Sequence, residues 1–264
     1  GETTIMKAVI LCGGLGTRLG EETHLKPKPM VDIGGMPILW HIMKLYEHHG
    51  FNDFMLALGY KGEVIKDYFL NYHPRTSDII VHLANGRAEY ANPTAENWTV
   101  RMVDTGQNTM TGGRLHRLEG QLRQHGTFML TYGDGVSDLD IHDLVAFHRK
   151  HGRLATVTAV RPPARFGTMV FDGDRVIDFH EKPQIGEGWI NGGFFVFESG
   201  IFDYLDGDTC VLEGEPLMRL ARDGQLMAYR YEGFWHCMDT LRDRNYLHAE
   251  WQAGRAPWKK WRDD

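Results

Sequence analysis

Short apolar segments of strand length alternate with longer amphipathic segments along most of this sequence. Apolar runs end at glycines or polar turns, as buried parallel strands do, at residues 7–12, 54–60 and 128–134. The spacing of apolar residues predicts helices between Pro37 and Gly50 and over residues 62–72, 113–122 and 140–150. Because this alternation implies right-handed βαβ crossovers, we expect an α/β fold with a mainly parallel sheet flanked by helices.

Two regions depart from the alternation. Residues 77–104 hold two strand-like runs around the polar, turn-rich stretch NGRAEYANPTAEN, and a long irregular connection is more often functional than decorative. After Thr156 the strand-like runs crowd together, so we expect β-hairpins added to the core sheet. A C-terminal helical tail over 241–264 holds three of the seven tryptophans and should dock on the body or on another subunit.

The bulk composition excludes several classes of protein. A net charge of −6 argues against a general nucleic-acid binder, and no apolar run is long enough for a membrane span. We expect the natural chain to start at Met6 and to work in the cytoplasm. The three cysteines, Cys12, Cys210 and Cys237, fit neither a disulfide framework nor a zinc site.

A glycine turn follows the first predicted strand. The stretch LCGGLGTRLG lacks both the third glycine of a dinucleotide-binding turn, which would stand at Leu19, and the ending of a P-loop. Its backbone N–H groups could still cradle phosphates, with a hydroxyl from Thr17 and a bidentate charge from Arg18. Glycine turns after strands are also often only structural.

A proline-flanked lysine pair follows, in the stretch KPKPM. One interpretation is a solvated, stiff loop. The other is that Pro27 and Pro29 hold a lysine beside the same phosphates, because proline restricts its own backbone and that of its predecessor.

Together, GGLGTRL and KPKPM resemble the signature of the sugar-1-phosphate nucleotidyltransferases, and TYGDGV, EKP, NGGFFVF and FWHCMDT follow in that family's order. The resemblance covers essentially the whole chain. It implies an enzyme with a Rossmann-like, GT-A-like fold in a single domain over 1–264, with a nucleotide-binding half over 6–135 and a sugar-phosphate-binding half over 136–240.

The resemblance also implies the site residues. The catalytic groups would be Arg18, Lys28 and Lys182. The nucleotide would contact Leu11, Gly13, Gly14, Gly16, Thr17, Arg18, Lys28, Thr109, Gly112, Arg114 and Asp134. The sugar phosphate would contact Tyr132, Glu181, Lys182, Asn191, Gly192 and Gly193. Asp134 and Asp239 would share a Mg²⁺ ion, although a single aspartate at a strand end is often only a helix cap.

Several segments, among them the tail, resemble the branch of the family that joins CTP and α-D-glucose 1-phosphate into CDP-glucose and pyrophosphate, on the way to deoxysugars. Segment 77–104 belongs to this match, and we expect it to help enclose the nucleotide or the metal. The family and the aromatic tail suggest a homo-oligomer. Two alternatives stay open: the same fold using UTP, dTTP or another phosphorylated substrate, and a non-catalytic nucleotide-sensing protein.

Overall fold

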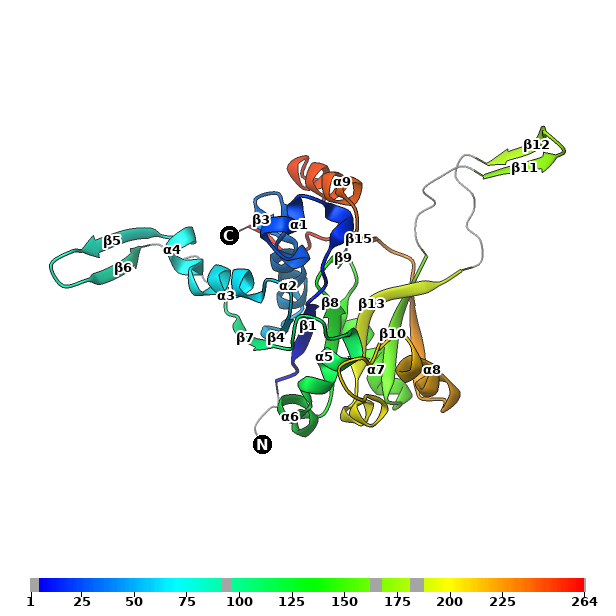
Figure 1. The fold of residues 1–264 in the computed structure, drawn as a ribbon, viewed down its shortest axis with the longest axis horizontal. Helices are drawn as coiled ribbons and strands as arrows, with labels where there is room; N and C mark the ends of the chain where they lie inside the picture. Colours follow the sequence, from blue (N-terminus) through cyan, green and yellow to red (C-terminus); the bar gives the residue numbers. More distant parts are fainter. Residues whose placement is uncertain (1–4, 92–95, 162–167, 181–187, 264) are drawn as a thin grey trace.

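A seven-stranded sheet forms the centre of the computed structural model, which describes residues 5–91, 96–161, 168–180 and 188–263 (Figure 1). The strands, in spatial order, are β14 (Leu226–Tyr231), β10 (Ala155–Val160), β13 (Ile190–Phe197), β8 (Phe128–Tyr132), β1 (Ala8–Cys12), β4 (Asp53–Leu58) and β7 (Thr99–Asp104). Only β13 in this sheet runs antiparallel to its neighbours, β8 and β10. The predicted mainly parallel α/β sheet is confirmed.

Helices cover both faces of the sheet, and alternate residues of β1 belong to two separate cores. Ala8, Ile10 and Cys12 pack in one core with α2 (Ile38–His48), α3 (Gly62–Leu70) and α7 (Ile141–His151). Val9 and Leu11 pack in the other with α5 (Thr111–Arg117), α6 (Glu119–Leu122) and α8 (Glu215–Arg222). Short elements connect these strands and helices: α1 (Glu22–Leu25), α4 (Tyr72–Thr76), η1 (Thr17–Leu19), η2 (Lys28–Met30), η3 (Arg123–His125), η4 (Ser199–Tyr204), β2 (Asp32–Ile33), β3 (Met36–Pro37), β9 (Gly135–Ser137) and β15 (Trp235–Cys237).

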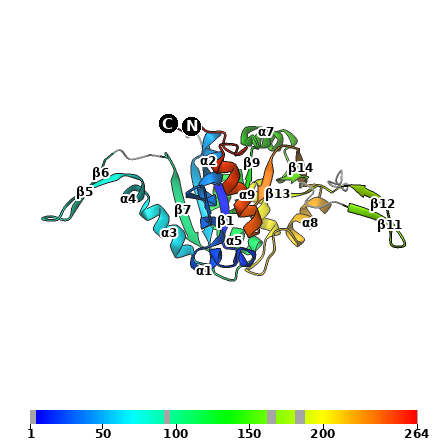
Figure 2. The ribbon, with the colours of Figure 1, turned by 90° about the horizontal axis from the view of Figure 1, so that it is seen from above.

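Two hairpins extend outward at opposite ends of the molecule (Figures 1 and 2). The first joins β5 (Asp78–His82) to β6 (Arg87–Ala91), so part of the stretch expected to be irregular is a strand. Its four-residue turn over 83–86 ends in an Asn-Gly pair, and Gly86 has φ +72, a conformation that favours glycine. The second joins β11 (Thr168–Asp172) to β12 (Arg175–His180) in a two-stranded sheet of its own, so the prediction that this hairpin extends the core sheet is wrong.

Arg114 on α5 joins the carboxyl ends of three strands. Its buried guanidinium donates hydrogen bonds to the carbonyl of Gly13 after β1 (3.2 Å) and to that of Leu58 in β4 (3.3 Å). Beyond β7 it binds the carbonyl of Gly106 (2.6 Å) and the hydroxyl of Thr105 (2.9 Å). A side chain built on Gly13 would lie 2.1 Å from the guanidinium carbon, so glycine is required for this close approach.

The tail docks on its own chain. Helix α9 (Leu241–Gln252) covers only the first half of the segment predicted to be helical, and turns follow it. Trp258 beyond it is buried, with its indole N–H donating to Nδ1 of His41 at 3.2 Å. Nε2 of His41 lies 2.7 Å from the carbonyl of Ile33, so the neutral ring donates there and accepts from Trp258.

We expect Gly13→Ala to lower the free energy of unfolding by about 1–3 kcal/mol, because its methyl group would displace a guanidinium held by several hydrogen bonds. Gly14→Ala is the matched control, since nothing lies within 4 Å of its added methyl group, and it should stay within about 0.5 kcal/mol of wild type. Urea denaturation of both variants measures this. Equal losses in the two variants would contradict the assigned role of Arg114.

Tail docking should weaken in acid. Burial lowers the pKa of His41 from 6.5 to about 4, so between these values the unfolded chain binds a proton that the folded protein excludes. Stability from this residue is therefore full above pH 6.5 and falls by about 1.4 kcal/mol per pH unit below it. His41→Gln keeps a donor and an acceptor but does not titrate. Its unfolding free energy should depend less on pH than that of wild type between pH 7 and 5, and parallel profiles would refute this.

Candidate active site

A cavity of about 660 Å³ opens at the carboxyl ends of β1 and β8, beside the first residues of β13. Open α/β sheets bind their ligands at this edge, because the loops after parallel strands gather there. Of the predicted site residues, the following line it: Leu11, Gly13, Gly14, Gly16, Lys28, Thr109, Arg114, Tyr132, Asp134, Asn191, Gly192 and Gly193. The predicted nucleotide and sugar-phosphate residues therefore share one cavity.

The glycine turn and the KPKPM stretch form one wall of this cavity. Gly16 has φ +62, and a side chain there would lie 3.0 Å from Cβ of Lys28 and 2.9 Å from a methyl group of Thr23. The hydroxyl of Thr23 donates to the carbonyl of Gly16 at 3.0 Å. Pro27 is extended and precedes η2, whose first residue is Lys28. The two motifs are thus packed together, as the second interpretation of the lysine pair required.

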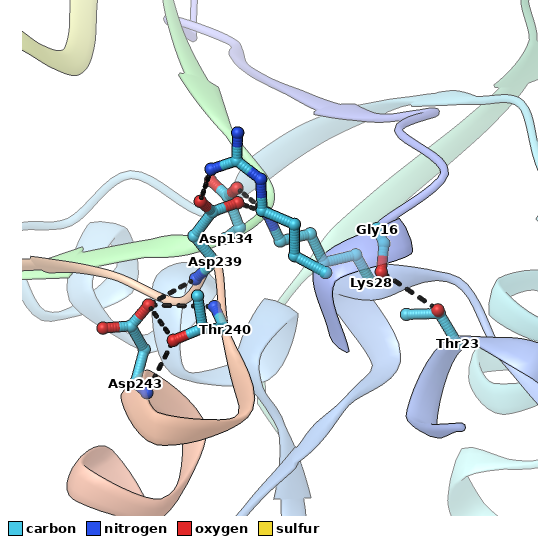
Figure 3. A network of polar contacts seen from close by, with 8 residues as sticks. Gly16, Thr23, Lys28, Asp134, Asp239, Thr240 and Asp243 are labelled. Carbon is cyan, nitrogen blue, oxygen red and sulfur yellow. Dashed lines mark hydrogen bonds and ion pairs between the residues drawn. The ribbon is translucent and has the colours of Figure 1, made fainter. Parts of the chain in front are cut away.

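Lys28 lies between the two predicted metal ligands (Figure 3). Its ammonium is 2.8 Å from a carboxylate oxygen of Asp134 and 3.2 Å from one of Asp239, and Arg18 contacts the other oxygen of Asp239 at 2.6 Å. Burial favours the neutral form of Lys28, but the charge and hydrogen bond of Asp134 outweigh it and raise its pKa. For Asp239 burial likewise opposes ionisation, and the contacts with Lys28 and Arg18 outweigh it and lower its pKa.

Asp243 holds the backbone that carries Asp239 (Figure 3). One oxygen of this buried carboxylate accepts the N–H groups of Asp239 (3.1 Å) and Thr240 (2.9 Å). Asp243 and Thr240 also form the capping box that begins α9, and His236 contacts the second oxygen at 3.0 Å. Sequence reasoning missed this residue, although a threonine followed three positions later by an acidic residue is a recognisable capping signal.

The remaining predicted residues lie elsewhere. In the described part of the chain, Thr17, Arg18, Gly112 and Asp239 are outside the cavity lining, with Arg18 and Asp239 tied to it through Lys28. Gly112 packs on Cys210, whose Sγ would lie 2.7 Å from an added side chain. The described part of segment 77–104 does not line the cavity, because its hairpin extends away from the body. Glu181 and Lys182 fall outside the described residues.

Several lining residues were not predicted. Gln107, Asn108, Met110 and Thr111 follow β7 and line one side of the cavity, while Trp235 and Cys237 come from β15. The indole N–H of Trp235 donates to the carbonyl of Gly192 at 2.8 Å and so joins β15 to β13. Burial raises the pKa of Cys237, so it is a thiol. Trp235 and Cys237 stand in the FWHCMDT motif, but no site role was predicted for them or for the four residues after β7, because tertiary contacts bring them to the cavity.

Comparison with solved structures supports the fold. HddC from Yersinia pseudotuberculosis superposes with a TM-score of 0.69 at 24% identity, over 93% of this chain and 99% of the other. UDP-glucose pyrophosphorylase complexed with UDP-glucose superposes with a TM-score of 0.69 at 16% identity, over 95% of this chain and all of the other. At such identities the likeness concerns the fold alone.

Comparison with curated sequences identifies the family as well as the fold. Glucose-1-phosphate cytidylyltransferase of Salmonella typhi is 54% identical over 97% of this chain and all of the relative. The probable glucose-1-phosphate cytidylyltransferase of Bacillus subtilis is 43% identical, again over 97% of this chain and all of the relative. A family profile described as nucleotidyl transferase matches residues 7–240. With its glycine turn, Lys28 and paired aspartates gathered around one cavity, the chain belongs to the nucleotidyl transferase family.

Proposed function

We propose that this protein transfers a cytidylyl group from CTP to α-D-glucose 1-phosphate, giving CDP-glucose and pyrophosphate. The 54% identity to a glucose-1-phosphate cytidylyltransferase over that relative's full length carries the proposal. The cavity supports it. The glycine turn forms one wall, and Tyr132, Asn191 and Gly192 form another. Lys28 and Asp134, which form an ion pair, line the cavity as well.

The chemistry joins two anions without a covalent protein intermediate. A phosphate oxygen of the sugar phosphate attacks the α-phosphorus of CTP in line, a new P–O bond forms, and the bond to pyrophosphate breaks. The protein must mainly neutralise charge and hold the reactants in position. Lys28 and Arg18 would stabilise the triphosphate and the leaving pyrophosphate, and Lys182 would hold the attacking phosphate.

Asp134 and Asp239 fit a Mg²⁺ site. They already share one cation, the Lys28 ammonium, which shows that the two carboxylates converge within reach of a single positive charge. Among the described residues there is no cluster of three or more metal-binding side chains. Two carboxylates suit Mg²⁺, which keeps several waters and takes substrate phosphate oxygens as further ligands. When bound, the ion would neutralise and orient those phosphates.

We also propose that the enzyme is a homo-oligomer and that it works in the cytoplasm. Exposed apolar side chains on β5 and in its turn, at Ile79, Ile80, Val81 and Leu83, support an interface in a homo-oligomer. No helix in the described residues has the length and apolarity needed to cross a membrane. We place the enzyme in the cytoplasm, where CTP is present.

A substrate panel tests the proposed reaction. Pyrophosphate release with glucose 1-phosphate should be most efficient with CTP and negligible with ATP and GTP. Against UTP and dTTP we expect roughly 10- to 100-fold discrimination per mismatched contact in kcat/KM, because cytosine and uracil exchange donor and acceptor. Equal efficiency with UTP would refute the cytidylyl assignment and leave the family assignment standing.

Asp239→Asn should lower kcat by about 100-fold or more, because a charge-stabilising group is lost at phosphoryl transfer, with the fold retained. Asp203→Asn is the control: this exposed carboxylate pairs with Arg123 at 3.0 Å outside the cavity, and its loss should leave kcat near wild type. Steady-state rates across a Mg²⁺ series and circular dichroism measure both effects. Near-normal turnover of Asp239→Asn at every Mg²⁺ concentration would remove this residue from the metal site.

A further inference from the structure

A one-directional chain of hydrogen bonds runs along the sugar-side wall of the cavity. The N–H of Gly193 donates to Oδ1 of Asn191 at 2.8 Å, and Nδ2 of Asn191 lies 3.1 Å from the hydroxyl oxygen of Tyr132. That hydroxyl in turn donates to Oε1 of Glu213 at 2.5 Å. Asn191 and Tyr132 line the cavity, whereas Glu213 stands behind Tyr132 in the loop before α8. No sequence motif marked Glu213.

The direction of this chain is fixed at its first link. Because Oδ1 of Asn191 accepts a backbone N–H, the amide is oriented and its nitrogen faces Tyr132. That nitrogen can only donate, so the phenolic oxygen accepts there and its single proton must go elsewhere. A carboxylate can only accept, and Glu213 accepts the hydrogen bond that the phenol donates. Burial, followed by the neighbouring carboxylate of Glu213, raises the pKa of Tyr132 and keeps the phenol protonated.

Glu213 is also held by Thr111, the first residue of α5. Its Oε2 accepts the hydroxyl of Thr111 at 2.6 Å, and the oxygen of Thr111 accepts the N–H of Leu212 at 3.0 Å. Both carboxylate oxygens are therefore engaged, and Tyr132 has a fixed acceptor for its proton. Among the described residues, no further contact uses the second N–H of Asn191 or the remaining lone pair of Tyr132, and both residues line the cavity.

An adjacent donor and acceptor match a hydroxyl group, which both accepts and donates. We propose that Glu213 is a positioning residue for specificity: by holding the Tyr132 proton, it makes this wall select a sugar hydroxyl that accepts from Asn191 and donates to Tyr132. The inference rests on the proposed function and narrows it to hexose 1-phosphates with a free hydroxyl at the ring position facing this wall. A deoxy carbon satisfies neither partner, and a fluorine cannot donate.

The test uses glucose 1-phosphates in which one hydroxyl at a time is replaced by hydrogen or by fluorine. With wild type, both analogues at one ring position should lose about 10- to 100-fold in kcat/KM, because a polar group of the wall is left unpaired once the bound sugar covers it. Glu213→Gln can donate where the carboxylate accepted. It should lower kcat/KM for glucose 1-phosphate and reduce the analogue penalty at that position to about threefold or less, as expected for coupled groups. The Kd for CTP measured alone should stay unchanged.

Two further variants keep the result interpretable. Glu215→Gln alters an exposed carboxylate two positions away that pairs with Arg222 at 3.2 Å, and it should keep the wild-type analogue profile. Tyr132→Phe removes the acceptor itself, and it should abolish the same penalty even where Glu213→Gln folds poorly. An unchanged analogue profile in a folded Glu213→Gln protein would overturn the inference. No pyrophosphate release by wild type with any sugar phosphate would instead refute the proposed function.

Discussion

The ammonium of Lys28 is the contact on which the charged part of the site depends. It bridges Asp134, at the end of a central strand, and Asp239, just before the last helix. Without it, two carboxylates would face each other beside a cavity proposed to receive a triphosphate, and Arg18, which is mostly exposed, would be the next cation in reach. Gly16 lets the backbone of the first loop lie against this lysine side chain. One positive charge thus holds together three segments that the sheet only brings near one another.

The central strands were predictable because burial on both faces leaves a strong signal. The apolar run at β1 and the helix beginning after Pro37 were found within a residue or two of their ends. The hairpins were harder. β5 was predicted as a strand-like run, but its partner β6 lies in the polar, turn-rich stretch and carries few apolar residues, so it was missed. The strands β11 and β12 carried a correct strand signal, but a strand pattern does not say which edge it pairs with.

The residues of the site, like the strands, were predictable only in part. Gly16, Lys28 and Asp134 were predicted because they lie in contiguous motifs, in which the glycine and lysine suit phosphates and the aspartate suits a metal ion. Asp243 and Glu213 were missed because each acts on a neighbour, not on the cavity. Asp243 carried a capping signal that says nothing of a site, and Glu213 carried no local signal at all. Arg114 was predicted to contact the nucleotide. Its guanidinium is bound to carbonyls at the ends of three strands, so its described contacts hold together the wall of the cavity that it lines.

The ion pairs around Lys28 also bear on when the site can form during synthesis, because they join residues far apart in the sequence. Arg18 and Asp239 are separated by 221 positions in the chain, and His41 and Trp258 by 217. Contacts between residues so distant form late, because the chain must first close a long loop. A nascent chain on the ribosome already carries the glycine turn and Lys28 but not the carboxylate of Asp239. Emergence of the segment that follows β14 is therefore the step at which an unfinished polypeptide becomes capable of completing its site.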